Sequence, residues 1–175
     1  NSEGIRGVVL PHHNLVAEYI DEFYLEISEE NVERIILLSP NHFDLGYHFI
    51  QSANELDTDL ELDKNLINKL DDENLLAVEP VVFESEHGVM VHIKYIEKYF
   101  PDAKVIPIMI KWATPEENLD NLLQAILAEE NMVSTLVITS IDFTHFVSEE
   151  VAKNNDDRTM AWFEDWGSGK IKDSS

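Results

Sequence analysis

Histidines follow three of the buried strands that the sequence predicts, each time at or near the point where the strand ends. They are His12 and His13 after residues 5–10, His42 after residues 34–39, and His145 with Asp142 after residues 134–140. In a parallel α/β sheet, residues just past the carboxyl ends of the strands line the crevice where ligands bind. Imidazole nitrogens with a nearby carboxylate suit a divalent transition metal. The pattern therefore predicts a metal site at one edge of a sheet.

A second pair of candidate residues, Glu86 and His87, stands at the start of a predicted helix. In a strand–helix pattern such a helix start can face the same sheet edge, so we expect both residues to line the pocket. His48 and His92 have a simpler interpretation, since one lies inside a predicted strand and the other within a predicted helix. A lone histidine in such a place is more often a loop residue or a satisfied polar group than a ligand.

Two aromatic residues near these strand ends are further pocket candidates. Trp112 follows the predicted strand 103–110 and is expected to wall the pocket, and Phe143 lies between Asp142 and His145 as a core or rim residue. The histidines have no short zinc signature such as H-E-x-x-H. The metal prediction therefore rests on where the histidines fall rather than on one motif.

The elements that must position these residues alternate along the chain. The predicted strands are 5–10, 34–39, 47–53 (less buried), 103–110 and 134–140, and the predicted helices are 15–27, 62–70, 87–100, 114–127 and 148–166. Residues 78–84 are predicted to be extended because of Pro80. Near-continuous apolar strands between amphipathic helices indicate a mostly parallel sheet covered by helices on both faces. We expect a single α/β domain over residues 1–175.

Two helix starts carry capping signals. Asp63 is expected to cap the helix 62–70. Thr114, with Pro115 at the first position and Glu117 completing a capping box, is expected to begin the helix 114–127.

The composition excludes several classes of function. The chain has 12 Lys plus Arg against 35 Asp plus Glu, a formal charge of −23, which disfavours nucleic acid and anionic membranes as partners. It has no cysteine, so a disulfide scaffold, a thiolate metal site and a cysteine nucleophile are excluded. No apolar run approaches the ~20 residues of a membrane span. A cytoplasmic location is the expectation.

Other catalytic patterns are weaker. The stretch "GSGK" at 167–170 lacks the preceding strand and the length of a phosphate-binding loop. Ser39 and Ser140 are conceivable nucleophiles, but neither sits in a G-x-S-x-G elbow.

Five stretches, in this order, resemble the Memo family, also called AmmeMemoRadiSam system protein B. They are "VVLPHH", "LLSPNHF", "SEHGVMVHI", "KVIPIMI" and "ITSIDFTHF", and the correspondence runs in register over nearly the whole chain. The resemblance implies a fold similar to that of class III extradiol dioxygenases, with a metal centre at the strand ends. It implies His12, His42 and His145 as metal ligands, with His87 and Asp142 as catalytic residues lining the site. His12 rather than His13 matches the family's P-H.

The chain departs from the family pattern at several places. Met90 stands where the family has a second Glu, and Thr144 where it has a Cys. Family members also carry a Cys near the site in a C-terminal segment, which we expect to be absent from this chain or replaced by a different arrangement. Because of these departures, no carboxylate is clearly placed as a ligand of the metal.

Three functions follow as hypotheses. The first is a Memo-like metal protein with redox or non-haem iron oxygenase chemistry, in which Fe(II) is the first candidate and Cu or Zn are alternatives. The second is a zinc-type metal-dependent hydrolase. The third is a module without enzymatic activity that retains the fold and binds a peptide or partner. By resemblance alone, association with radical-SAM and AMMECR-type proteins is implied; the substrate stays open.

Overall fold

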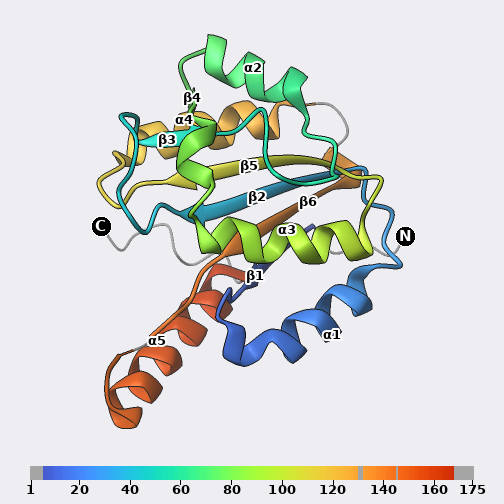
Figure 1. The fold of residues 1–175 in the computed structure, drawn as a ribbon. Coiled ribbons are helices and arrows are strands. Elements are labelled where there is room, and N and C mark those ends of the chain that lie inside the picture. The colour runs from blue at the N-terminus through green and yellow to red at the C-terminus, as the bar shows by residue number, and fades with distance from the viewer. Residues whose placement is uncertain (1–5, 130–131, 145, 168–175) are drawn as a thin grey trace. The chain divides into compact units, whose positions relative to one another are not determined.

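A computed structural model describes residues 6–129, 132–144 and 146–167, which fall into two compact units. Residues 1–141 form the first unit and residues 142–175 the second. The first unit is an α/β structure with a six-stranded sheet, which confirms the predicted fold class (Figure 1). The described residues of the second unit include the helix α5 (Glu149–Gly167), where the sequence predicted 148–166. The single domain over residues 1–175 stays a prediction.

The sheet is mostly parallel, with the strand order β1-β6-β2-β5-β3-β4. Its strands are β1 (Gly7–Leu10), β2 (Arg34–Pro40), β3 (Ile50–Ser52), β4 (Ala77–Val78), β5 (Lys104–Ile110) and β6 (Thr135–Ser140). Strands β1, β6, β2 and β5 run parallel, whereas β3 is antiparallel to β5 and pairs in parallel with β4. Leu10 is in register with Ser140. The ends of β1, β6 and β2 therefore reach the same edge of the sheet.

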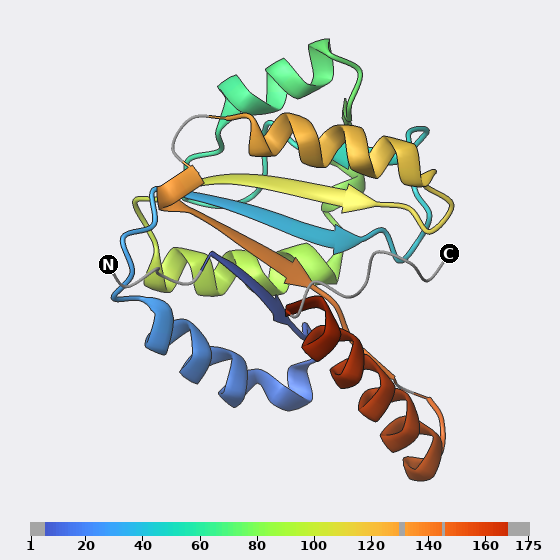
Figure 2. The same ribbon diagram turned by 180° about the vertical axis from the view of Figure 1, so that it is seen from behind.

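Helices cover both faces of the sheet, as two opposite views show (Figures 1 and 2). The helices of the first unit are α1 (Ala17–Ile27), α2 (Lys64–Asp72), α3 (His87–Tyr99) and α4 (Glu116–Leu127), with short 3-10 helices at Asn14–Val16, Pro80–Phe83 and Met132–Ser134. Helix α3 lies over one face with α1 beside it, and α4 covers the opposite face. Within the described residues, no helix has both the length and the apolar character needed to cross a membrane.

The central strands are buried because both of their faces are covered. Ile35, Leu37 and Val105 are fully buried, and Ile36 and Ile106 are nearly so. This two-sided burial explains why the strands are continuously apolar instead of alternating with polar residues. The apolar face of α3, with Val89, Ile93 and Ile96, packs into the same core.

His92 holds α1 and α3 together from inside the core. Its Nδ1 lies 3.0 Å from the hydroxyl of Tyr24, and both side chains are fully buried. Burial raises the pKa of Tyr24 well above its usual value, so this phenol stays protonated. The simpler structural interpretation of His92 agrees with this contact.

Three local predictions are wrong. Pro80 does not prevent a helix, because proline is tolerated in the first turn, and residues 80–83 form a 3-10 helix. The strand predicted at 47–53 is shorter and fully buried rather than less buried, with β3 at Ile50–Ser52. Thr114 does not cap α4: its hydroxyl donates to the carbonyl of Lys111 at 2.7 Å, and the N-cap position belongs to Pro115.

The predicted cap of α2 is confirmed, and it generates a stability prediction. Asp63 accepts a hydrogen bond from the amide of Leu66 at 3.2 Å and pairs with Nε of Arg34 at 2.9 Å. We expect Asp63→Ala to lower the free energy of unfolding by ~2 kcal/mol, since it removes both the cap and the partner of Arg34. Asp63→Asn should cost less, because asparagine caps as well as aspartate. Chemical denaturation measures both; equal losses would contradict the capping role.

Candidate metal centre

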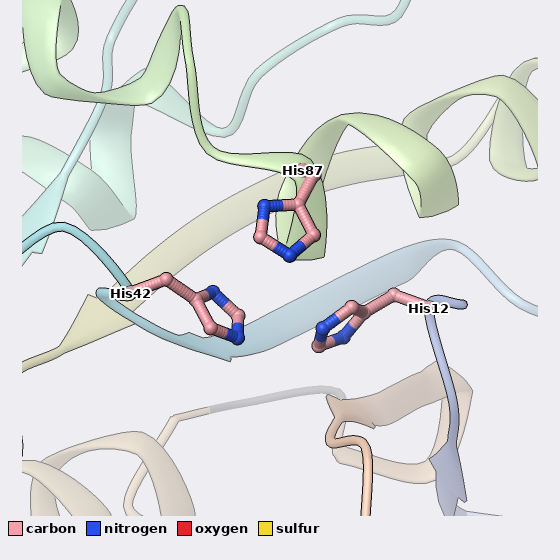
Figure 3. A group of neighbouring side chains, drawn as sticks. All are labelled: His12, His42 and His87. Carbon is pink, nitrogen blue, oxygen red and sulfur yellow. The ribbon is translucent and has the colours of Figure 1, made fainter. Parts of the chain in front are cut away.

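Three imidazole rings gather at the carboxyl edge of the sheet. One ligand nitrogen from each of His12, His42 and His87 can be chosen so that all three lie within 4.8 Å of one another. The ring centroids are 4.9 Å apart for His12 and His42, 5.1 Å for His12 and His87, and 4.4 Å for His42 and His87. The rings point into a common space from three separate segments (Figure 3). This group is called the three-histidine cluster below.

The parallel strands account for the convergence of these residues. His12 lies two residues beyond the end of β1, and His42 lies two residues beyond the end of β2. His87 is the first residue of α3, whose N-terminal end lies at the same edge. Residues far apart in the chain are therefore brought together by the strand ends and by one helix start.

The three-histidine cluster is open on one side. His12 is 3% exposed, whereas the side chains of His42 and His87 are 30% and 50% exposed. His12 therefore forms the floor of the cluster, and the other two rings border solvent. A bound ion would be reachable by a small molecule from the side of His42 and His87.

A buried carboxylate, Glu86, lies directly behind two of the imidazoles. Its side chain is 1% exposed and accepts from Nδ1 of His42 at 2.7 Å and from the His42 amide at 2.9 Å. It also accepts from the amide of Gly88 at 3.0 Å, which makes it the N-cap of α3. Its Oε1 lies 3.5 Å from Nδ1 of His87. Glu86 therefore fixes the ring of His42 and the start of the helix that carries His87.

His12 is held from behind by a hydroxyl group. Its Nδ1 lies 2.8 Å from Oγ of Ser140, the last residue of β6, and Ser140 is fully buried. The same hydroxyl donates to the carbonyl of Gly88 at 2.6 Å. Ser140 therefore connects the β1 end, the β6 end and the start of α3.

The loop that follows His42 is fastened by side chains from neighbouring segments. Nδ2 of Asn41 donates to the carbonyl of Leu45 and to Oε1 of Gln51, both at 2.8 Å. Glu79 accepts from Nε2 of Gln51 at 2.5 Å and from the amide of Tyr47 at 3.1 Å. These contacts hold the loop 41–49 on the end of the sheet and so limit where His42 can lie.

The structure brings together three of the predicted site histidines. His12 and His42 were predicted as ligands and His87 as a catalytic residue, and all three belong to the cluster. His145, the third predicted ligand, lies outside the described residues. Asp142 belongs to the second compact unit, and its orienting or catalytic role stays a prediction.

The predicted pocket residues have different surroundings. Glu86 is the buried carboxylate behind the cluster. His13 is exposed, and its Nδ1 accepts from the amide of Leu15 at 3.2 Å, so the ring serves as a local cap. Trp112 follows β5 and is fully exposed. Phe143 packs edge-to-face against Phe163 within the second unit, with ring centroids 6.2 Å apart.

Two supporting roles were missed by the sequence reasoning. Ser140 was considered only as a nucleophile, and Glu86 only as a pocket residue. Glutamate is not among the residues preferred at the N-cap, so no capping signal in the sequence marked the role of Glu86 at α3. Ser140 carries no signal either, because a serine that ends a strand has many uses.

Comparisons with known proteins place this chain in a family. The family model "Memo-like protein" matches residues 1–173. A "MEMO1 family protein" of Nitrosopumilus maritimus is 27% identical in an alignment of 169 positions that covers 89% of this chain and 59% of that protein. Another, of Caldivirga maquilingensis, is 24% identical in an alignment of 169 positions that covers 89% of this chain and 58% of that protein. The chain thus spans less than two thirds of the length of these relatives.

Gly88 gives the first prediction about the site. A Cβ atom there would overlap Oγ of the buried Ser39 and would lie 3.3 Å from Cε1 of His42. We expect Gly88→Ala to displace the start of α3 and to lower the free energy of unfolding by about 1–3 kcal/mol. Gly7→Ala is the matched control, because its nearest contact would be an ordinary 3.9 Å. Equal stability of the two variants in chemical denaturation would contradict close packing at Gly88.

Glu79 gives a prediction about pH. Burial opposes its ionisation, but hydrogen bonds from Gln51, the Tyr47 amide and His48 outweigh burial and hold the pKa of Glu79 below its usual 4.5. A lowered pKa contributes stability that is complete above about pH 4.5 and is lost as the pH falls through the folded-state value. Hydrogen exchange at the Tyr47 amide should therefore accelerate in acid beyond its intrinsic pH dependence. Glu79→Gln should remove this extra acceleration; if it persists in that variant, another group is responsible.

Proposed function

This chain belongs to the Memo-like family, and we propose that its three-histidine cluster binds a divalent transition metal. The observation that carries the proposal is the convergence of three imidazole nitrogens to within 4.8 Å, directly in front of a buried carboxylate. Because the chain covers 59% or less of the cited relatives, the activity, substrates and partners of a whole family member belong to this proposal too.

The chemistry of the donor set fits such an ion. Neutral imidazoles are common ligands for iron, copper and zinc. Nitrogens bound tetrahedrally to one zinc at 2.0–2.1 Å are roughly 3.4 Å apart. Ligand atoms within 4.8 Å of one another need side-chain movements of only ~1 Å to reach that arrangement.

The charge around the cluster also favours a cation. Glu86 is 1% exposed, and no lysine or arginine in the described part of the chain contacts it. A buried carboxylate without a lysine or arginine partner is costly. A divalent ion held by the imidazoles would supply the missing positive charge.

For the reaction we propose redox or oxygenase-type chemistry, with Fe(II) as the first candidate and Cu as an alternative. Such a metal supplies electron transfer and open coordination positions for small molecules. His12, His42 and His87 hold the ion, and Glu86 orients the ring of His42. His145 and Asp142 remain proposed as a further ligand and an orienting carboxylate.

A zinc-type hydrolase is the second candidate, and the composition of the cluster supports it. The cluster contains three histidines and no carboxylate ligand within the described residues. Three histidines with an open fourth position are the ligand set of one class of catalytic zinc sites, in which bound water ionises near neutral pH. Identifying the metal separates this candidate from the redox one.

Metal analysis of the native chain, purified without a metal-affinity column, tests the proposal. We expect about one equivalent of iron, copper or zinc per chain. His42→Ala should weaken metal affinity by at least ~10-fold in competition titrations with a chelator, because it removes one of three ligands. His13→Ala is the control, since His13 lies outside the cluster. Substoichiometric metal, or equal affinity in both variants, would overturn the proposal.

A further inference from the structure

We propose that Ser140 and Glu86 are positioning residues that act as one unit and leave Nε2 of both His12 and His42 as the metal donor. The inference rests on the proposed metal binding. It assigns a role to Ser140, a buried hydroxyl that the proposed chemistry does not use. Two sets of hydrogen bonds behind the cluster meet at Gly88 and fix the ring protons of His12 and His42.

The proton on His12 follows from the single proton of Ser140. The Ser140 hydroxyl donates to the carbonyl of Gly88 at 2.6 Å, because a carbonyl can only accept. Having one proton, the hydroxyl must accept in its 2.8 Å contact with Nδ1 of His12. Nδ1 therefore carries the ring proton, and neutral His12 keeps its lone pair on Nε2.

The same tautomer follows for His42. A carboxylate accepts only, so Nδ1 of His42 donates to Glu86 at 2.7 Å and leaves the lone pair on Nε2. Carboxylates and hydroxyls that receive the second ring proton of a metal-binding histidine fix the orientation of the ring and raise its basicity. The tautomers of His12 and His42 are thus fixed by two different acceptors, the Ser140 hydroxyl and the Glu86 carboxylate.

Gly88 joins the two halves of this hydrogen-bond path through the two peptides on either side of its Cα. Its carbonyl accepts from Ser140, and its amide donates to Oε1 of Glu86 at 3.0 Å. The path therefore runs from His12 through Ser140, Gly88 and Glu86 to His42. Because Gly88 carries both groups on the two peptides that flank its Cα, a shift at Ser140 is passed to Glu86 and to the start of α3. We expect the two positioning residues to be energetically coupled.

His87 differs from the other two rings. Its Nδ1 lies 3.5 Å from Glu86, beyond hydrogen-bond distance, and its side chain is half-exposed. The cluster therefore contains two preset donors and one ring that adjusts. In such a site, His12 and His42 would set the position of the ion, and His87 would complete the coordination from the solvent side.

The first test uses the metal-free full chain, where nitrogen–proton NMR correlations report which ring nitrogen is protonated. Wild-type His12 and His42 should both be protonated at Nδ1 at a pH where the rings are neutral. Ser140→Ala should shift His12 toward a mixture of tautomers. Ser52→Ala is the matched control: Ser52 is also fully buried in a strand and donates to a carbonyl, that of Pro107, at 2.7 Å. An unchanged His12 tautomer in Ser140→Ala would overturn the proposal.

The second test is metal affinity in a double-mutant cycle. Ser140→Ala and Glu86→Gln should each weaken affinity by about 10–100-fold, whereas Ser52→Ala should leave it unchanged. In the double variant, the loss should be smaller than the product of the two single losses, because one network is broken in both. Losses that multiply would refute the coupling through Gly88.

The two tests also separate this inference from the proposed function. If wild-type protein binds no metal while the tautomers respond as expected, the metal proposal fails and the positioning of the rings stands. If wild-type protein binds metal but the tautomers do not respond to Ser140→Ala, the positioning fails and the metal proposal stands. NMR dispersion of Ser140→Ala and Ser52→Ala verifies that both variants are folded.

Discussion

The arrangement of the candidate site depends on the buried carboxylate of Glu86. It caps α3 through the amide of Gly88 and receives both the amide and the ring proton of His42. A carboxylate at a helix N-terminus is favoured by the unpaired amides and by the helix dipole. The interaction that begins α3 therefore also fixes one imidazole and sets where His87 emerges. One side chain, Glu86, therefore both caps the helix and positions the site residues.

The parallel sheet supplies the other half of the geometry. Leu10 and Ser140 are in register at the ends of β1 and β6, so the segment after β1 starts beside Ser140. This explains why the ring of His12, two residues later, reaches a hydroxyl on the neighbouring strand. The floor of the three-histidine cluster is built from rigid strand ends, whereas His42 and His87 border solvent. Rigidity on the buried side and access on the other suit a site that holds an ion and admits a small molecule.

The fold could be predicted because burial on both faces leaves a clear record in the sequence. The strands β2 and β5 are continuous apolar runs, and α3 shows the apolar period of a helix packed on a sheet. Predictions of local structure were wrong where one residue type can serve two structural roles. Proline disrupts the interior of a helix but is favoured in its first turn. Which of the two applies to Pro80 depends on how residues 80–83 pack. Thr114 instead donates to the carbonyls of Phe49 and Lys111, which depends on β3 lying beside β5.

The site was partly predictable for the same reason. Strand ends can be located from apolar runs, so His12 and His42 could be placed at one edge before any contact was known. The supporting roles of Ser140 and Glu86 could not be predicted, because they depend on the register of the strands and on which atom carries each hydrogen-bonding proton. Ser140 acts on His12 across 128 residues of sequence, and Glu86 acts on His42 across 44. These long-range acceptors decide which ring nitrogen keeps its lone pair. A cluster of histidines is suited to bind a metal only when those lone pairs face the common space between the rings.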